Sequence, residues 1–214
     1  MPATLLEYWA EDYDSGTNTW ANRGSLGSLG DLSLTGTAPT KGTDATGPYV
    51  DFAGVTGFLE TTSTFSTSYV DDDWTVYALF DVVAANGFIF DLQKSGKRVT
   101  LRSEAARIRV LDSSYRDFSS PGAGNLHYAA YVLNGTVPEM RAFLVDDVAD
   151  ASNPAVYNPQ VVDAGVRMAI GALATSGSTP FAGKVRAISI AGALHDAPTR
   201  AQAQAAHEEV WTLP

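Results

Sequence analysis

The chain has 214 residues, of which 45% are hydrophobic and 18% charged, and its formal net charge at pH 7 is -10. This length fits one domain of the larger all-β kind or two small ones, and the apolar content excludes a disordered chain, because enough side chains are available for a core. The absence of cysteine excludes disulfide scaffolds and thiolate metal sites, three histidines are too few for a histidine-rich metal centre, and the acidic balance argues against nucleic acid as a partner.

The N-terminal segment starts at Met1 and carries neither a basic region nor a long apolar run, so we expect no signal peptide. No stretch approaches the roughly 18 apolar residues of a membrane-spanning helix, so we expect no membrane insertion. Residues 14–47 are rich in Gly, Ser and Thr, with leucines at intervals. We interpret this region as a long ordered loop that contains short strands.

From residue 74 onward, apolar side chains recur at every second position in many short segments. The first of them places on one face Trp74, Val76, Ala78, Phe80 and Val82. Later segments are 88–92, 99–101, 108–110, 128–132, 140–144 and 166–170, and turn pairs such as Asn-Gly at 86–87 and 134–135 separate them. This spacing predicts an antiparallel two-sheet β-sandwich.

The expected core takes its members from the main apolar face of these segments: Trp74, Phe80, Phe90, Leu101 and Val132. Several segments are apolar on the second face as well, for example at Tyr77 and Leu79. Such strands would lie centrally in a sheet whose outer face is partly covered. Because no linker divides the chain, we predict a single domain over residues 1–214.

Residues 196–211 break the alternating pattern and are rich in Ala and Gln, which are good helix formers. Asp196 can cap the N-terminus of a helix, and Pro198 is tolerated in its first turn. We therefore predict one short C-terminal helix, with Trp211 packing back onto the sandwich.

Several short motifs occur in order along the chain. They are Trp-Ala-Asn-Arg-Gly at 20–24, Gly-Pro-Tyr-Val-Asp-Phe-Ala-Gly at 47–54, Asp-Trp-Thr-Val at 73–76, Gly-Phe-Ile-Phe at 87–90, Phe-Ala-Gly-Lys-Val at 181–185 and Ala-Leu-His-Asp at 193–196. With this set the chain resembles the laminin-G-like branch of the concanavalin A-like lectin/glucanase superfamily over residues 5–211. The resemblance implies a two-sheet jelly roll with a concave face. It leaves the function open, because the superfamily includes lectins, glycosidases, adhesion modules and structural proteins of bacteriophages.

Catalytic signatures are weak in this sequence. Retaining glucanases of the superfamily carry two carboxylates at alternate positions of one strand, as acid and nucleophile. None of the seven glutamates lies in such a pair, and the nearest approach is Glu7 with Glu11. The sequence also has no Gly-x-Ser-x-Gly elbow and no phosphate-binding loop of the Walker type. We therefore expect no enzymatic activity.

Acidic clusters could hold Ca²⁺, which takes six to eight oxygen ligands, often from loops. The candidate ligands lie in two runs, with Asp12 and Asp14 as a further pair: Asp71, Asp72 and Asp73, and then Asp146, Asp147 and Asp150. The other interpretation is that these carboxylates are solvated loop charges or caps of helices and turns. No complete ligand-loop spacing decides between the two.

Half of all the cations fall between residues 94 and 116. In a hairpin of residues 98–110, alternation points Val99, Leu101, Ile108 and Val110 inward and the arginines outward. The outward face would carry Arg98, Arg102, Arg107 and Arg109, close to Tyr115 and Arg116. Guanidinium groups bind carboxylates, sulfates and phosphates, so this face suits an anionic glycan or an acidic protein surface. The plainer interpretation is an exposed sheet face balanced by Glu104, Asp112 and Asp117.

Two further residues are candidates for ligand contact. Trp20, in a loop rich in Gly and Asn, could offer its ring to a sugar, although packing is the alternative. His127 could hydrogen-bond a ligand, although a single histidine is more often structural.

These observations favour a non-catalytic module for binding or assembly. Our leading hypothesis is a decoration or fibre component at the surface of a phage particle or in a similar extracellular adhesive assembly. It would pair with other structural subunits or with copies of itself. The alternative is a free lectin domain that binds an anionic, cell-surface glycan, and a glycoside hydrolase or lyase comes third.

Overall fold

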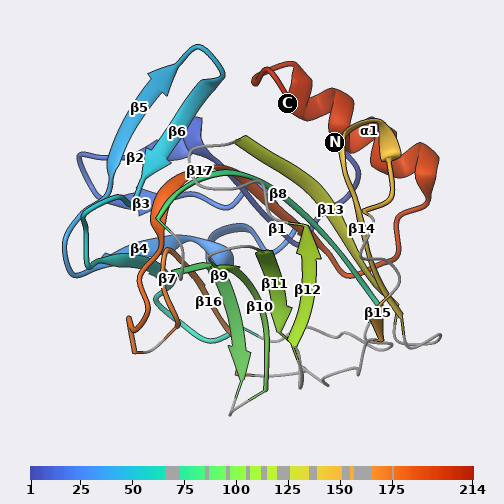
Figure 1. Ribbon diagram of the computed structural model, residues 1–214. Coiled ribbons are helices and arrows are strands. Elements are labelled where there is room, and N and C mark those ends of the chain that lie inside the picture. The colour runs from blue at the N-terminus through green and yellow to red at the C-terminus, as the bar shows by residue number, and fades with distance from the viewer. Residues whose placement is uncertain are drawn as a thin grey trace.

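The computed structural model describes residues 1–65, 73–84, 87–94, 97–104, 107–111, 115–119, 126–134, 139–150, 155–156, 165–174 and 176–214. The described part of the chain forms two antiparallel sheets and one α-helix, which confirms the predicted all-β, two-sheet sandwich with a C-terminal helix. Figure 1 shows the helix at the upper right, on the outer side of one sheet, and the second sheet below that sheet, on the side away from the helix.

Sheet A carries the helix on its outer face. Within the described residues its strand order is β15-β14-β13-β8-β17-β6-β5, and β1 also pairs with β17. The bounds are β1 Leu6–Trp9, β5 Thr40–Asp44, β6 Gly47–Asp51, β8 Trp74–Ala84, β13 Leu126–Asn134, β14 Glu139–Phe143, β15 Ala155–Val156 and β17 Ala182–Ala191. Strands β8, β13 and β17 are the long central strands of this sheet, and β13 and β14 face the helix at the candidate site.

Sheet B forms the other layer, with the order β12-β11-β10-β9-β16-β7-β4-β3-β2 in the described residues. Its strands are β2 Tyr13–Asp14, β3 Thr19–Trp20, β4 Leu32–Thr35, β7 Phe58–Thr61, β9 Gly87–Lys94, β10 Lys97–Glu104, β11 Arg107–Leu111, β12 Tyr115–Ser119 and β16 Arg167–Ile170. Three 3₁₀ turns are also described: η1 Ala10–Asp12, η2 Gly27–Gly30 and η3 Val145–Asp147. The region 14–47 is thus an ordered loop with short strands, as predicted.

Alternation along β8 is confirmed. Trp74, Phe80 and the residues of the same face lie in the core between the sheets, while Tyr77 and Leu79 lie on the outer face, under the helix. Of the other predicted core residues, Phe90 and Leu101 are buried in the same cluster.

On β13 the predicted face was wrong. Tyr131 and Leu133 face the core between the sheets, Tyr128 faces the helix, and Val132 is only partly buried. The register pairs Tyr131 with the core residue Val76, and directly opposed residues of an antiparallel pair share a face. Because both faces of β13 are apolar, the alternation alone could not show which face is the inner one.

Helix α1 spans Ala197–Glu208 and begins as predicted. The Asp196 carboxylate caps it by accepting a hydrogen bond from the backbone N–H of Thr199 at 3.0 Å, and a proline stands in the first turn. After the helix, Trp211 is buried and donates its indole N–H to the carbonyl of Pro48 at 2.7 Å. Its ring lies 5.2 Å from that of Trp9 and so ties the C-terminal segment to β1. No helix within the described residues combines the length and apolar character needed to cross a membrane.

Candidate functional site

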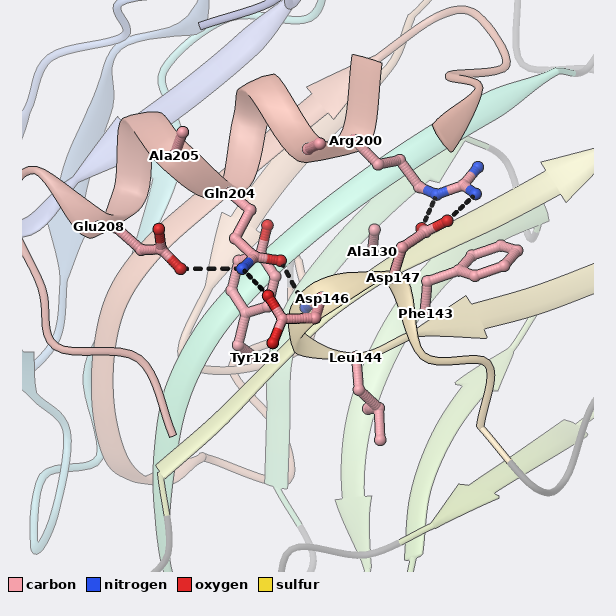
Figure 2. A pocket seen from close by; sticks show the side chains of 11 residues that line it. Tyr128, Ala130, Phe143, Leu144, Asp146, Asp147, Arg200, Gln204, Ala205 and Glu208 are labelled. Carbon is pink, nitrogen blue, oxygen red and sulfur yellow. Dashed lines mark hydrogen bonds and ion pairs between the residues drawn. The ribbon is translucent and has the colours of Figure 1, made fainter. Parts of the chain in front are cut away.

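A groove of about 290 Å³ runs between α1 and the β13–β14 side of sheet A. Its floor is apolar and consists of Tyr128, Ala130, Phe143 and Leu144. Its rim is polar and comes from two segments far apart in the sequence, the η3 turn and one face of α1, as Figure 2 shows. The rim residues are Asp146, Asp147, Arg200, Gln204 and Glu208, with Ala201 and Ala205 between them. We call this cavity the α1 groove.

The rim residues of α1 lie side by side because the α-helix repeats about every 3.6 residues. Arg200, Gln204 and Glu208 are spaced four apart, and residues at this spacing lie on one face of an α-helix. Ala201 and Ala205 line the same face, and their short side chains leave the groove open.

The η3 turn directs two carboxylates toward the helix. Asp146 and Asp147 both have a φ of 58°, in the left-handed region that few residues other than Gly, Asn and Asp adopt. A backbone hydrogen bond of 2.8 Å from Leu144 to Val148 closes the turn. Left-handed backbone at non-glycine residues costs stability, and such residues cluster at functional sites.

Arg200 and Asp147 form one link between the turn and the helix. The guanidinium Nε and Nη2 atoms lie 2.5 and 2.9 Å from the two carboxylate oxygens, a bidentate geometry. The third nitrogen donates to the carbonyl of His195 at 2.6 Å, and the group lies 3.7 Å from the Phe143 ring centroid. Both the charge and the donor nitrogens of Arg200 are therefore committed within the protein.

Gln204 forms the second link. Its carbonyl oxygen accepts from the backbone N–H of Asp146 at 2.8 Å, and its amide nitrogen donates to Glu208 at 2.8 Å and to Asp146 at 3.3 Å. Each carboxylate uses one oxygen in these bonds. Among the described residues, Asp146 Oδ2 and Glu208 Oε2 receive no hydrogen bond, which leaves them as acceptors on the rim.

Tyr128 stands behind Gln204 in the floor of the groove (Figure 2). The side chain is 3% exposed, and its hydroxyl has no hydrogen-bond partner within the described part of the chain. Burial raises the pKa of this phenol, so it remains a neutral group with a proton to donate. A buried polar group without a partner costs stability, so the Tyr128 hydroxyl is an unused donor at the floor of the groove.

An aromatic layer supports the groove from below. The His207 ring is fully buried, with ring centroids between 5.6 and 6.2 Å from those of Trp9, Tyr77, Tyr128 and Trp211. Neither of its nitrogens has a partner among the described residues, and burial lowers the pKa of His207 to about 4. His207 is therefore a neutral ring at pH 7 that docks the last turn of α1.

A second, apolar cavity of about 410 Å³ adjoins the α1 groove and shares Tyr128 and Leu144 with it. It is lined by Leu126, His127, Tyr128, Leu144, Val145, Val148 and Pro214. Although His127 lines this cavity, it is largely buried, and its Nε2 lies 3.0 Å from the Tyr131 hydroxyl. Burial lowers the pKa of His127 to about 4, so the ring is neutral at pH 7, and its contact with a ligand stays a prediction.

Trp20 is not a sugar platform. It is fully buried, its indole N–H donates to the carbonyl of Trp9 at 2.7 Å, and its ring meets those of Tyr8 and Tyr13 edge-on at 6.0 Å. The Gly- and Asn-rich surroundings suggested an exposed loop. Pairing of β3 with β2 and β4 instead turns this residue into the core.

The structure describes only part of the predicted basic face. Val99, Leu101 and Ile108 lie in the core, as predicted, and the register places Arg102 directly opposite Arg109. Arg102 lies 3.3 Å from the Glu104 carboxylate and 5.1 Å from the Phe88 ring centroid. The other predicted side chains of this face lie outside the described ones: Arg98, Arg107, Arg109, Tyr115 and Arg116. Their role stays a prediction.

The structure also describes only some of the predicted calcium ligands. Asp71 and Asp72 lie outside the described residues, and Asp73 is partly buried. In the second run Asp147 is neutralised by Arg200 and Asp146 is held by Gln204, and Asp150 is buried. No three potential metal ligands come together in the described part of the chain. The 146–150 run therefore has no geometric basis as a calcium site.

A charge cluster that the sequence analysis missed lies on the outer face of sheet A, around another cavity of about 290 Å³. Arg186 is 1% exposed and donates to Asp81 at 2.7 Å and to Asp44 at 2.9 and 3.1 Å. Lys184 reaches the same Asp44 at 2.7 Å. Hydrogen bonds from Arg186 and Lys184 hold the pKa of the Asp44 carboxyl well below its usual range. The two positive charges of this cluster equal its two negative charges, so we interpret it as a structural network.

No protein-family model matches this sequence, and a search of curated proteins found no match. Solved structures do match. Domain 4 of an extracellular arabinanase from Geobacillus stearothermophilus, in complex with arabinotriose, aligns with a TM-score of 0.58 at 11% identity, over 92% of this chain and 96% of that domain. The binding domain of botulinum neurotoxin DC, in complex with SialylT, aligns with a TM-score of 0.66 at 9% identity, over 96% of this chain and 52% of the other.

The chain has a concanavalin A-like β-sandwich fold. It spans about half the length of the neurotoxin binding domain. A carbohydrate esterase from the Shiga toxin-encoding bacteriophage phi24B aligns with a TM-score of 0.50 at 16% identity, over 88% of this chain and 97% of that one. At these identities the likeness establishes the fold, and the function must be argued from the site.

Proposed function

We propose that this chain is a non-catalytic carbohydrate-binding domain and that the α1 groove is its binding site. The observation that carries the proposal is the groove itself, which combines an apolar floor, unused carboxylate oxygens on the rim and a buried phenol without a partner. Small-molecule sites have this composition, with a few polar groups that fix the orientation of the ligand. Sugar rings present both an apolar face and hydroxyl groups, so they match both parts of the lining.

The fold supports the same proposal. Among the structures of similar fold, one was solved in complex with arabinotriose and another in complex with SialylT. The arabinanase domain aligns over nearly its whole length. We therefore favour glycan binding over the particle-component hypothesis, which the phage esterase supports through its source alone.

The non-catalytic part of the proposal rests on the carboxylates. Glu7 is buried and accepts a hydrogen bond from Thr4 at 2.6 Å, and Glu11 pairs with Arg23. This nearest approach to a catalytic pair is thus engaged in local structure. Incubation with the glycans that bind should release no reducing ends above a heat-inactivated control.

The decisive test is steric closure of the groove. Ala205→Trp would fill the space between α1 and the floor without removing any of the bonds made by Arg200 or Gln204. We expect this variant to lose retention on a glycan array and in affinity electrophoresis through neutral polysaccharide gels. The matched control is Gln202→Trp, on an exposed position of the same helix that does not line the groove. Equal retention of the two variants would refute the groove as the site.

A further inference from the structure

We infer that the α1 groove selects uncharged, hydroxyl-rich glycans and discriminates against anionic ones, with Asp146 and Glu208 as the determinants. This inference deepens the proposed function and rests on it. It also differs from the sequence-based expectation, in which a basic face on the other sheet binds an anionic glycan.

The balance of charge in the lining carries the first step. Three carboxylates and one guanidinium line the groove: Asp146, Asp147, Glu208 and Arg200. The bidentate pair of Arg200 with Asp147 removes one charge of each sign. Two negative charges remain, with only the neutral amide of Gln204 between them. A carboxylate or sulfate group on a ligand would therefore meet like charges without a compensating cation.

The positions of Asp146 and Glu208 are locally unfavourable. Asp146 has left-handed backbone, and Glu208 is the last residue of α1, where the helix dipole disfavours a negative side chain. Gln204 holds both carboxylates at the rim by its amide nitrogen (Figure 2). Neither carboxylate pairs with a cation among the described residues, so the rim keeps its negative charge.

The available hydrogen-bonding groups match a hydroxyl. The free oxygens of Asp146 and Glu208 can only accept, whereas the Tyr128 phenol can donate. A sugar hydroxyl satisfies both kinds of partner, because it donates one hydrogen bond and accepts others. An ionised carboxylate or a sulfate has no proton to donate, so it cannot satisfy the rim oxygens. The charge of the lining and its hydrogen-bonding groups therefore both favour an uncharged ligand with several hydroxyl groups.

The test compares matched glycans that differ only in charge. A panel of arabinan, galactan, xylan and dextran, each with its carboxymethylated derivative, is run through affinity gels and isothermal titration calorimetry. We expect binding to at least one neutral polysaccharide and about tenfold weaker binding to its carboxymethylated form. Glu208→Gln and Asp146→Asn should narrow this ratio, since both substitutions keep the shape and the hydrogen bonds to Gln204. Asn also tolerates the left-handed backbone at position 146.

The control variant is Glu209→Gln, which makes the same change of charge one residue further along, outside the groove. It should leave the ratio between neutral and charged glycans unchanged. Equal or tighter binding of the carboxymethylated forms by the wild-type protein would overturn the selectivity while leaving glycan binding in place. Binding of no polysaccharide, neutral or charged, would instead overturn the proposed function and the inference with it.

Discussion

Arg186 shows at the scale of a single residue how a buried charge is tolerated in this fold. Its guanidinium is 1% exposed, yet it faces Asp44 and Asp81 at hydrogen-bonding distances. A buried charge without a partner is costly, so removal of one partner costs more than the pair itself contributes. The three residues come from β17, β5 and β8, so the network fixes the β5 strand against the centre of sheet A.

We expect Arg186→Met to lower the free energy of unfolding by about 3 kcal/mol, because it leaves Asp81 and Asp44 facing each other without their shared cation. Lys184→Met should cost no more than about 1 kcal/mol, because the Lys184 ammonium is partly exposed and Arg186 still serves Asp44. Urea denaturation of the two variants measures the difference. Similar urea midpoints for the two variants would show that the buried Arg186 contributes no more to stability than the partly exposed Lys184.

At the scale of an element, the packing of helix α1 onto sheet A involves two histidines. Its last turn is docked by a neutral His207 among four aromatic rings, and the residue before its N-cap, His195, lies 2.8 Å from the Tyr77 hydroxyl through Nδ1. Burial lowers the pKa of both histidines. Protonation of His207 would place a charge in an apolar layer that offers no acceptor among the described residues, so the docking of α1 depends on pH.

Because the folded-state pKa of His207 lies at about 4, below its ordinary value of 6.5, the unfolded chain takes up the proton first on acidification. The free energy of unfolding should therefore fall as the pH drops from about 6.5 to about 4, and His127 contributes in the same direction. His207→Phe or His207→Leu should flatten this dependence by about 3 kcal/mol. Chemical denaturation at several pH values, followed by tryptophan fluorescence, measures it. If the free energy of unfolding fell with pH equally in the wild type and the variant, His207 would not be the group responsible.

Charge is unevenly distributed over the whole molecule. Residues 1–90 carry two basic against twelve acidic side chains, and residues 91–116 carry seven basic against three acidic ones. The register places Arg102 opposite Arg109 on the neighbouring strand of this basic segment. An acidic partner surface, including one on a second copy of the chain, would complement the concentration of positive charge in residues 91–116. Assembly through this hairpin is therefore compatible with glycan binding at the α1 groove on the other sheet.

We predict that reversing Arg102 and Arg107 to Glu lowers the mass of any assembly in analytical ultracentrifugation, because the complementary charges at the contact are lost. The control reverses Arg141 and Arg167, which lie on β14 and β16. An assembly that survives the hairpin double variant, or a wild-type chain that stays monomeric at high concentration, would rule the hairpin out as an interface.

The sequence by itself determined the features that depend on neighbours along the chain. The alternation of β8, the cap at Asp196 and the burial of Trp211 were all predicted correctly, because strand period and helix capping are local properties. The class of fold followed from the spacing of such elements.

Tertiary structure alone decided which surfaces meet. Tyr128 on β13, Asp146 on η3 and Glu208 on α1 form one groove although as many as 80 residues separate them. Of these three, the sequence singled out only Asp146, and it did so as a candidate calcium ligand. The same holds for Trp20: the sequence left open whether it contacts a ligand or packs inside, and the pairing of three short strands places it in the core. A site assembled across layers depends on packing between segments that are distant in the sequence, and local sequence patterns do not show which of these segments meet.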